Sequence, residues 1–466
     1  MSNQLWAILI VSLLILLTLL ALLVNRRAAL VACVHNAVWA GAIFLIGTNL
    51  IRYFPASTEA WLVLVLALVT FNFGSIVAIA RSRDKISSEY IAVPQALVAR
   101  STVIAMLAVY SVAVAIYLDT IADRFGLGTL FSDPASIRSA SGVSYLESVP
   151  LAARLGLYLG PILIGLLGFS GAMRGTIPFP LRGLLLVLIA ASMLLLLQRT
   201  NLYMGVLWLV SLYLSKDFGQ GKLEPSPRAR SRSGRARVLG RWRIIAPVVL
   251  AGILLTGSFQ IVGAALGKAG QQALSTGAVS EPLARSGLTS PFVYYTAGTV
   301  AFLQLVDSTN YETPPERVQG SMRLGDNNPQ TWGTATFAPV LKVFPVAPPV
   351  DSISPFIDTG VLTNVYTWNE PLFRDFRLWG VAFGMLALGF SMSWLFVNRF
   401  RSTLLYWVQA AFLSTLFLAT FVAKFNNILL LASVMFVIAL SAYSALRKPR
   451  RYHARTRTAG QNAKLP

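Results

Sequence analysis

The chain has little of the chemistry that disulfides and metal sites require. Its 466 residues include one cysteine, Cys33, and two histidines, His35 and His453. A disulfide needs two cysteines, and protein zinc sites are built from clusters of Cys, His and carboxylate ligands. The composition therefore excludes an internal disulfide and a multi-Cys/His metal site, and it predicts a protein that uses no metal and no cofactor.

Charge is also scarce. Only 12% of the residues are charged, whereas a soluble domain carries about 25%, and 55% are hydrophobic. The mean hydropathy of +0.65 agrees with an integral membrane protein. The formal net charge of +21 is then typical of basic cytoplasmic loops and does not indicate a nucleic-acid partner.

Eleven apolar segments are long enough to cross a membrane, which takes roughly 20 apolar residues. They are residues 4–24, 28–51, 60–80, 98–118, 151–171, 180–197, 200–215, 244–264, 376–397, 402–422 and 426–446. The first segment is followed, and not preceded, by positive charge, which is the opposite of a cleavable signal peptide. The predicted fold is an all-α polytopic membrane protein of about eleven transmembrane helices, with its N-terminus outside and its C-terminus in the cytoplasm.

The distribution of charge supports this topology. The segments predicted to lie inside hold 26 Lys or Arg and 4 Asp or Glu, and the rest of the chain holds 13 and 14. A single misplaced span would mix the two groups, because every later loop would change sides. The orientation therefore follows the positive-inside rule.

The same topology divides the chain into four parts. An N-terminal transmembrane bundle (1–215) with an outer loop (119–150) is joined by a basic cytoplasmic linker (216–243) to a C-terminal transmembrane part (244–446). A basic cytoplasmic tail (447–466) ends the chain. The C-terminal part contains a large extracytoplasmic loop (265–373), late in the chain, in which the apolar stretch 291–306 is predicted as an interfacial or re-entrant helix.

Arginines on the predicted outer side are the strongest candidates for chemistry. The planar guanidinium suits bidentate contacts to phosphate, and several of them could stabilise a diphosphate leaving group without a metal. The candidates are Arg124, Arg138, Arg154, Arg199, Arg285, Arg317, Arg323, Arg374 and Arg377. No acidic residue lies in the middle of a predicted span, which argues against carboxylate-coupled ion transport.

Four short stretches resemble the Wzy-type family of bacterial O-antigen and capsule repeat-unit polymerases. "TNVYTWNEPLFRDFRLWG" (363–380) resembles the family's Asn-x-Tyr-Thr … Asp-Phe-Gly … Gly stretch. "QRTNLYMGVLWLVSLYL" (198–214) is similar to its Arg-Thr turn and the helix that follows. "FVYYTAGTVAF" (292–302) and "FGLGTLFSDPASIRSA" (125–140) resemble its Tyr-x-x-Gly helix and its loop ending in Ile-Arg. One departure is that Arg377 stands where the family has the glycine of Asp-Phe-Gly.

The resemblance implies a glycosyltransferase in the bacterial cytoplasmic membrane. Such an enzyme polymerises, at the outer face of the membrane, oligosaccharide repeats that are carried on polyprenyl diphosphate. Its expected partners are this lipid-linked substrate, membrane lipid, a flippase and a chain-length regulator. It implies diphosphate contacts for Arg138 and Arg199. The residues expected to bind or position substrate are Arg285, Tyr295, Asn364, Tyr366, Thr367, Asp375 and Arg377.

The stretch before the 376–397 span admits a structural interpretation as well. Trp368 and Tyr366 are expected to anchor at the membrane interface, and Asp375 to cap or orient the following helix. Other functions also stay open: an O-antigen ligase-like or other lipid-linked-sugar glycosyltransferase, a lipid-linked oligosaccharide flippase or transporter, and a non-enzymatic scaffold. A transporter should have polar span interiors, which this sequence lacks.

Overall fold

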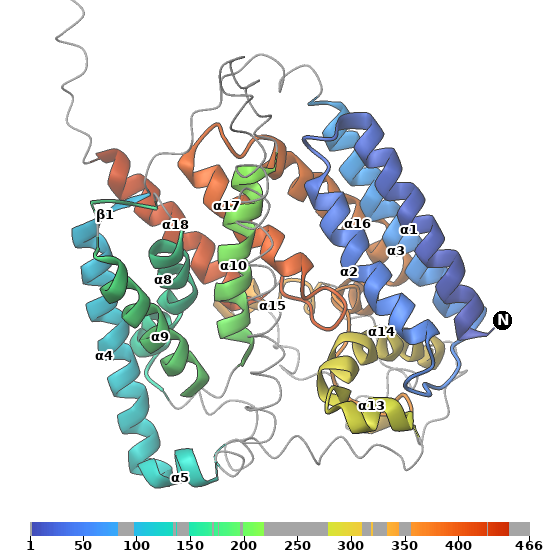
Figure 1. The fold of residues 1–466 in the computed structure, drawn as a ribbon, viewed down its shortest axis with the longest axis horizontal. Helices are drawn as coiled ribbons and strands as arrows, with labels where there is room; N and C mark the ends of the chain where they lie inside the picture. Colours follow the sequence, from blue (N-terminus) through green and yellow to red (C-terminus); the bar gives the residue numbers. More distant parts are fainter. Residues whose placement is uncertain are drawn as a thin grey trace, which may run out of the picture.

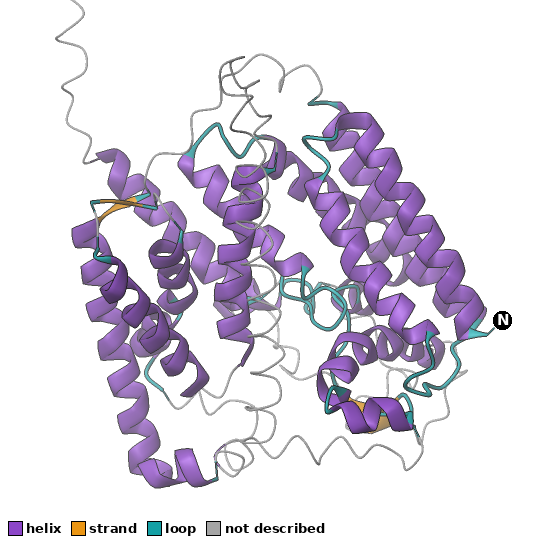
Figure 2. Cartoon of the chain, viewed as in Figure 1, coloured by secondary structure: helices purple, strands orange, loops and turns teal. Residues whose placement is uncertain are grey.

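The computed structural model is mostly helical (Figure 2). It describes residues 2–82, 97–133, 137, 149–169, 172–175, 177–195, 199–218, 278–309, 318–319, 333–343, 356–425 and 427–446. Seven helical segments within these residues are long and apolar enough to span a membrane. They are α1 (Asn3–Asn25), α2 (Leu30–Gly47), α3 (Thr58–Ala80), α4 (Arg100–Phe125), α7 with α8 (Leu151–Leu157 and Leu159–Gly168), α16 (Glu370–Val397) and α18 (Ile428–Leu446). The expectation of an all-α membrane protein is confirmed at this level.

The other four predicted spans differ from this set. The spans at 180–197 and 402–422 correspond to shorter apolar helices, α9 (Phe179–Leu195) and α17 (Thr403–Leu416). α17 ends early because residues 417–421 form turns. The span at 200–215 is α10 (Arg199–Asp217), which is not among the seven, and 244–264 lies outside the described residues.

The helices pack around two large apolar cores, and α17 joins them (Figure 1). One core is formed by α1, α2, α3, α16 and the helix α14 (Thr289–Thr309), and the other by α4, α8, α9, α10 and α18. Leu413 and Leu416 of α17 belong to the first core, whereas Tyr406 and Trp407 belong to the second. Helices from the two ends of the sequence therefore share both cores.

The closest helix contact in the first core is between α3 and α16. A Cβ added to Gly74 would lie 2.1 Å from the Leu386 carbonyl oxygen, and one added to Gly389 would lie 2.0 Å from that of Phe71. Only glycine allows two helix backbones to approach this closely, as small residues do in membrane helix pairs. The hydroxyls of Ser75 and Ser393 are 2.6 Å apart in the same contact.

Hydrogen bonds connect loops that the sequence assigns to the same side of the membrane. On the predicted inner side, β1 (Val98–Ala99) pairs in parallel with β2 (Met173–Arg174), and the Ser444 hydroxyl donates to the Leu97 carbonyl (2.6 Å). The Arg399 guanidinium donates to the Ser215 carbonyl (3.0 Å). These bonds connect the ends of α4, α10, α16 and α18 that face the predicted inner side.

The predicted outer side contains α14, α13 (Glu281–Ser286) and a small antiparallel sheet. The sheet is formed by β3 (Val318–Gln319), β4 (Phe356–Asp358) and β5 (Leu362–Thr363). Figure 1 shows α13 and α14 at the end of the bundle where α1 begins. The helix expected at 291–306 is present as α14, and two short helices, α5 (Leu127–Ser132) and α15 (Ala338–Val343), also lie in predicted outer segments.

Side chains join α14 to the α2–α3 connection. The Asp307 carboxylate accepts hydrogen bonds from the Ser57 backbone N–H (3.0 Å) and hydroxyl, and Ser57 is the N-cap of α3. The Gln304 amide donates to the Pro55 carbonyl (3.0 Å). A carboxylate beside a helix N-terminus is electrostatically favourable, so Asp307 has a structural task at this position.

Candidate functional site

The two arginines expected to contact diphosphate cannot be placed at side-chain level. Arg138 lies outside the described residues. Arg199 is the first residue of α10, and its side chain is not among those described. Both remain predictions.

Arg285 and Tyr295 lie in the outer helices, and each has an intramolecular partner. Arg285 is exposed on α13 and forms an ion pair with Glu281, one helical turn away. The Tyr295 hydroxyl donates to the Val38 carbonyl of α2 (2.6 Å), and its ring lies over Gly41. Tyr295 therefore fixes α14 against α2, and Arg285 occupies a solvated surface.

The segment before α16 is largely buried. Asn364 is half-buried, whereas Tyr366 and Thr367 are buried. The Thr367 hydroxyl accepts a long hydrogen bond from the Asn369 backbone N–H (3.4 Å). Burial and the Glu370 carboxylate raise the pKa of the Tyr366 hydroxyl above its ordinary value. Of the expected sugar contacts in this segment, Asn364 is the one that retains partial exposure.

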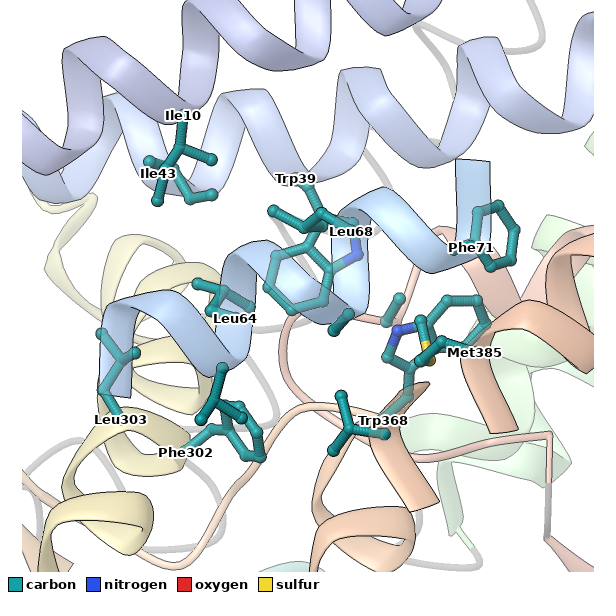
Figure 3. Close-up of a cluster of buried hydrophobic side chains, with 14 of the residues drawn as sticks. Ile10, Trp39, Ile43, Leu64, Leu68, Phe71, Phe302, Leu303, Trp368 and Met385 are labelled. Atoms are coloured by element: carbon teal, nitrogen blue, oxygen red, sulfur yellow. The ribbon is translucent and has the colours of Figure 1, made fainter. Parts of the chain in front are cut away.

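The expectation that Trp368 and Tyr366 anchor at the membrane interface is wrong, because both side chains are buried in the first core. Trp368 is fully buried in the first core, and Figure 3 shows it with Phe71 and Met385. Its ring centroid is 5.5 Å from that of Phe71 and 5.8 Å from that of His35. Its backbone N–H donates to the Ala419 carbonyl (2.9 Å), so the segment passes between α2, α3 and the end of α17.

Asp375 lies in the short first part of α16, two residues before the backbone break at Arg377 that separates it from the long helix. Its role in capping or orienting that long helix stays a prediction. Its buried carboxylate accepts the backbone N–H groups of Ala335 (3.1 Å) and Thr336 (2.6 Å). It thereby fastens the turn at 333–337, and α15 behind it, to the first turns of α16.

A buried ion pair accompanies Asp375. Arg374 Nη2 is 2.6 Å from Glu370 Oε1, and both side chains are less than a tenth exposed. The Arg374 Nε atom is buried without a hydrogen-bond partner. Arg374 is one of the nine arginines predicted on the outer side. Its Glu–x₃–Arg spacing from Glu370, which places opposite charges on one helix face, is the sequence signal for this pair.

Arg377 has the most unusual backbone in the segment. Its φ of 53° and ψ of −137° break α16 into a short helix and a long one. A residue with a Cβ is strained at such angles, at a cost on the order of 1–3 kcal/mol. The break is sharp, since a Cβ added to Gly380 would lie 2.2 Å from the Leu372 carbonyl oxygen. Arg377 stands where the Asp-Phe-Gly motif quoted above has its glycine. The backbone at this position keeps a conformation that favours glycine, although the residue is arginine.

The Arg377 side chain is half-buried at this kink. Its guanidinium carbon lies 5.4 Å from the centroid of the Phe373 ring, in cation–π contact. Its Nη1 atom is buried and has no hydrogen-bond partner. One nitrogen of the guanidinium at the kink therefore donates no hydrogen bond to the described residues.

A second buried polar group lies in the first core, on the other side of Trp368. His35 stacks on Phe71 with centroids 3.9 Å apart, and its Nδ1 is 3.0 Å from Asn36 Oδ1. Asn36 and Asn72 exchange two amide hydrogen bonds of 2.8 and 2.9 Å. This arrangement joins α2 to α3.

Nothing in the described part of the chain forms a cluster of three or more His, Cys, Asp or Glu residues suited to a metal ion. No family model, curated protein or solved structure matches the chain.

Proposed function

We propose that this protein polymerises oligosaccharide repeat units linked to polyprenyl diphosphate, at the outer face of the membrane. The proposal combines the membrane-embedded helical fold with the four short sequence stretches described above. It is a transfer reaction. The bond between the donor sugar and the diphosphate breaks and polyprenyl diphosphate leaves, while the hydroxyl oxygen of an acceptor glycan forms the new glycosidic bond and releases its proton to the departing diphosphate or to water.

The observation that carries the proposal is Arg377. A charged residue held in a glycine-type conformation costs folding free energy, and such strain concentrates where a side chain serves function. Arg377 also leaves a guanidinium nitrogen without a partner. A diphosphate at this half-buried guanidinium would accept its hydrogen bonds and would be stabilised as negative charge develops on the leaving group.

The neighbouring residues would hold this guanidinium in place. Phe373 contacts one face of the guanidinium group, and Asp375 fixes the short helix to the 333–337 turn. The buried Glu370–Arg374 ion pair lies in the short helix that leads to the kink. Arg138 and Arg199 remain the other proposed diphosphate contacts.

The test is an extension assay with purified protein and lipid-linked oligosaccharide, without added metal. Wild-type protein is expected to produce a ladder spaced by whole repeats. Arg377→Gly is the informative variant, because glycine suits the backbone conformation while the guanidinium is lost. We expect it to lose at least about 100-fold in rate, comparable to the loss of one oxyanion-stabilising donor, while Arg377→Lys retains part of the activity.

The same assay separates the alternatives. A single-step shift in place of a ladder would indicate a ligase or single-sugar transferase. Absence of any product with substrate that another polymerase extends would contradict enzymatic transfer and favour transport. An Arg199→Ala sample in parallel tests the second proposed contact: an unchanged ladder would reduce Arg199 to a helix-start residue.

A further inference from the structure

The helix that leaves the Arg377 kink carries exposed aromatic side chains. Trp379 is 71% exposed and Phe383 is 63% exposed. Their rings stack with centroids 5.7 Å apart and an interplanar angle of 13°. Leu378, at 47% exposure, extends the apolar surface toward Arg377.

The order of these residues along α16 matches the order of chemical groups in a phosphate-headed lipid. Arg377 lies at the start of the long part of α16, and Phe383 follows six residues later, which is about 9 Å along a helix axis. A phosphate held by the half-buried Arg377 guanidinium would place the first part of its hydrocarbon chain beside Trp379 and Phe383. Charge complementarity fixes the head, and apolar contact fixes the chain.

The far side of the kink is apolar too. The turn at 333–337, fastened by Asp375, presents Phe337 at 55% exposure, and Val340 of α15 is 44% exposed. The added Cβ of Gly333 would be 3.2 Å from the Phe337 ring and 3.6 Å from that of Phe376. Apolar side chains therefore continue across the kink from the long part of α16 to this turn.

We infer that Arg377, Trp379 and Phe383 form the site through which the lipid-linked substrate enters from the bilayer. The diphosphate binds Arg377, and the polyprenyl chain lies along the stacked pair on the membrane side of α16. This inference rests on the proposed function for the identity of the lipid, and it adds the path that the polyprenyl chain takes along α16.

The test compares two substrates that differ only in chain length. One is the natural lipid-linked oligosaccharide, and the other is the same oligosaccharide diphosphate with its chain truncated to one isoprene unit. The double variant Trp379→Ala/Phe383→Ala is expected to raise KM for the long-chain substrate about tenfold or more, as loss of apolar burial predicts. It should raise KM for the truncated substrate much less, because a single isoprene unit covers only the start of the stacked pair.

The matched control is Phe73→Ala, which removes an aromatic side chain of similar exposure (59%) from α3. It should change neither KM. Equal effects of the double variant and of Phe73→Ala would overturn the inference, because they would show a general effect of lipid-facing aromatics. An equal effect of the double variant on both substrates would also overturn it.

A binding measurement separates failure of this inference from failure of the proposed function. Polyprenyl diphosphate without sugar is titrated into protein in nanodiscs and detected by native mass spectrometry. If Arg377→Gly and the double variant both weaken this binding at least tenfold, the lipid site is supported even when no polymer forms. Absence of polymer would then contradict only the proposed polymerase activity. Equal displacement by phosphatidylglycerol would overturn the inference, since the site would then hold any anionic lipid.

Discussion

Single residues at the start of α16 combine strain with buried charge, and Arg377 is the clearest case. We predict that Arg377→Gly stabilises the protein by about 1 kcal/mol, because relief of a φ of 53° exceeds the extra entropy of glycine in the unfolded chain. Thermal unfolding in detergent measures it. Arg377→Ala retains the strain, so a gain as large as that of the glycine variant would contradict this explanation.

The buried pair Glu370–Arg374 has an exposed counterpart with the same spacing, Glu281–Arg285. We predict that Glu370→Gln destabilises the fold by about 3–5 kcal/mol, since it leaves the Arg374 charge buried and uncompensated. Glu281→Gln should leave the unfolding midpoint unchanged, because water solvates Arg285. Similar midpoints for the two variants would show that the Glu370 pair is not desolvated as described.

Lys424, between α17 and α18, gives a pH prediction. Burial lowers the pKa of its ammonium from 10.5 to about 8. Between these two values the unfolded chain binds more protons than the folded one, so stability should rise as pH increases from about 8 to about 10.5. Lys424→Met should remove this rise and increase the unfolding temperature at pH 7. A wild-type midpoint that falls as steeply as that of the variant would contradict the assignment.

At the scale of elements, the α3–α16 contact is the most demanding. Gly389→Val would force a side chain onto the Phe71 carbonyl, so we predict a loss of at least about 2 kcal/mol and separation of the two helices. Gly183→Ala in α9 is the matched control. No atom lies within 4 Å of its added Cβ, and alanine favours helix by up to about 1 kcal/mol. Equal destabilisation by both would mean that the close approach is not required.

At the scale of the whole molecule, the orientation that the charge distribution predicts can be tested. We predict that Ala284→Cys in α13 reacts with a membrane-impermeant maleimide in intact cells, whereas Ala80→Cys at the end of α3 does not until the cells are opened. Both positions are exposed. The native Cys33 is first replaced by serine. The reverse pattern would invert the orientation that the charge distribution predicts.

The sequence was sufficient for what depends on local composition. Apolar runs predicted the seven long helical segments, because a span must bury about 20 apolar residues in lipid wherever it lies in the fold. The same patterns predicted a helix at 291–306, which is present as α14. α9 and α17 are shorter than predicted, since the apolar pattern continues through residues 417–421 while the backbone turns.

The candidate site depended on contacts between distant segments, which composition does not encode. Trp368 was expected at the interface because tryptophan favours that boundary, but His35 and Phe71 offered a buried partner surface. Asp375 was expected to cap or orient the following helix, and local sequence gave no sign that its carboxylate accepts the backbone N–H groups of residues 335 and 336.

The sequence by itself thus determined a basic, apolar, multi-span helical protein with arginines at the predicted outer side, because hydropathy and charge act locally. The tertiary structure alone decided the glycine-type kink at Arg377, the buried Glu370–Arg374 pair and the course of 363–369 through the core. The physical reason is that backbone strain and buried charge persist only where surrounding packing over-determines them.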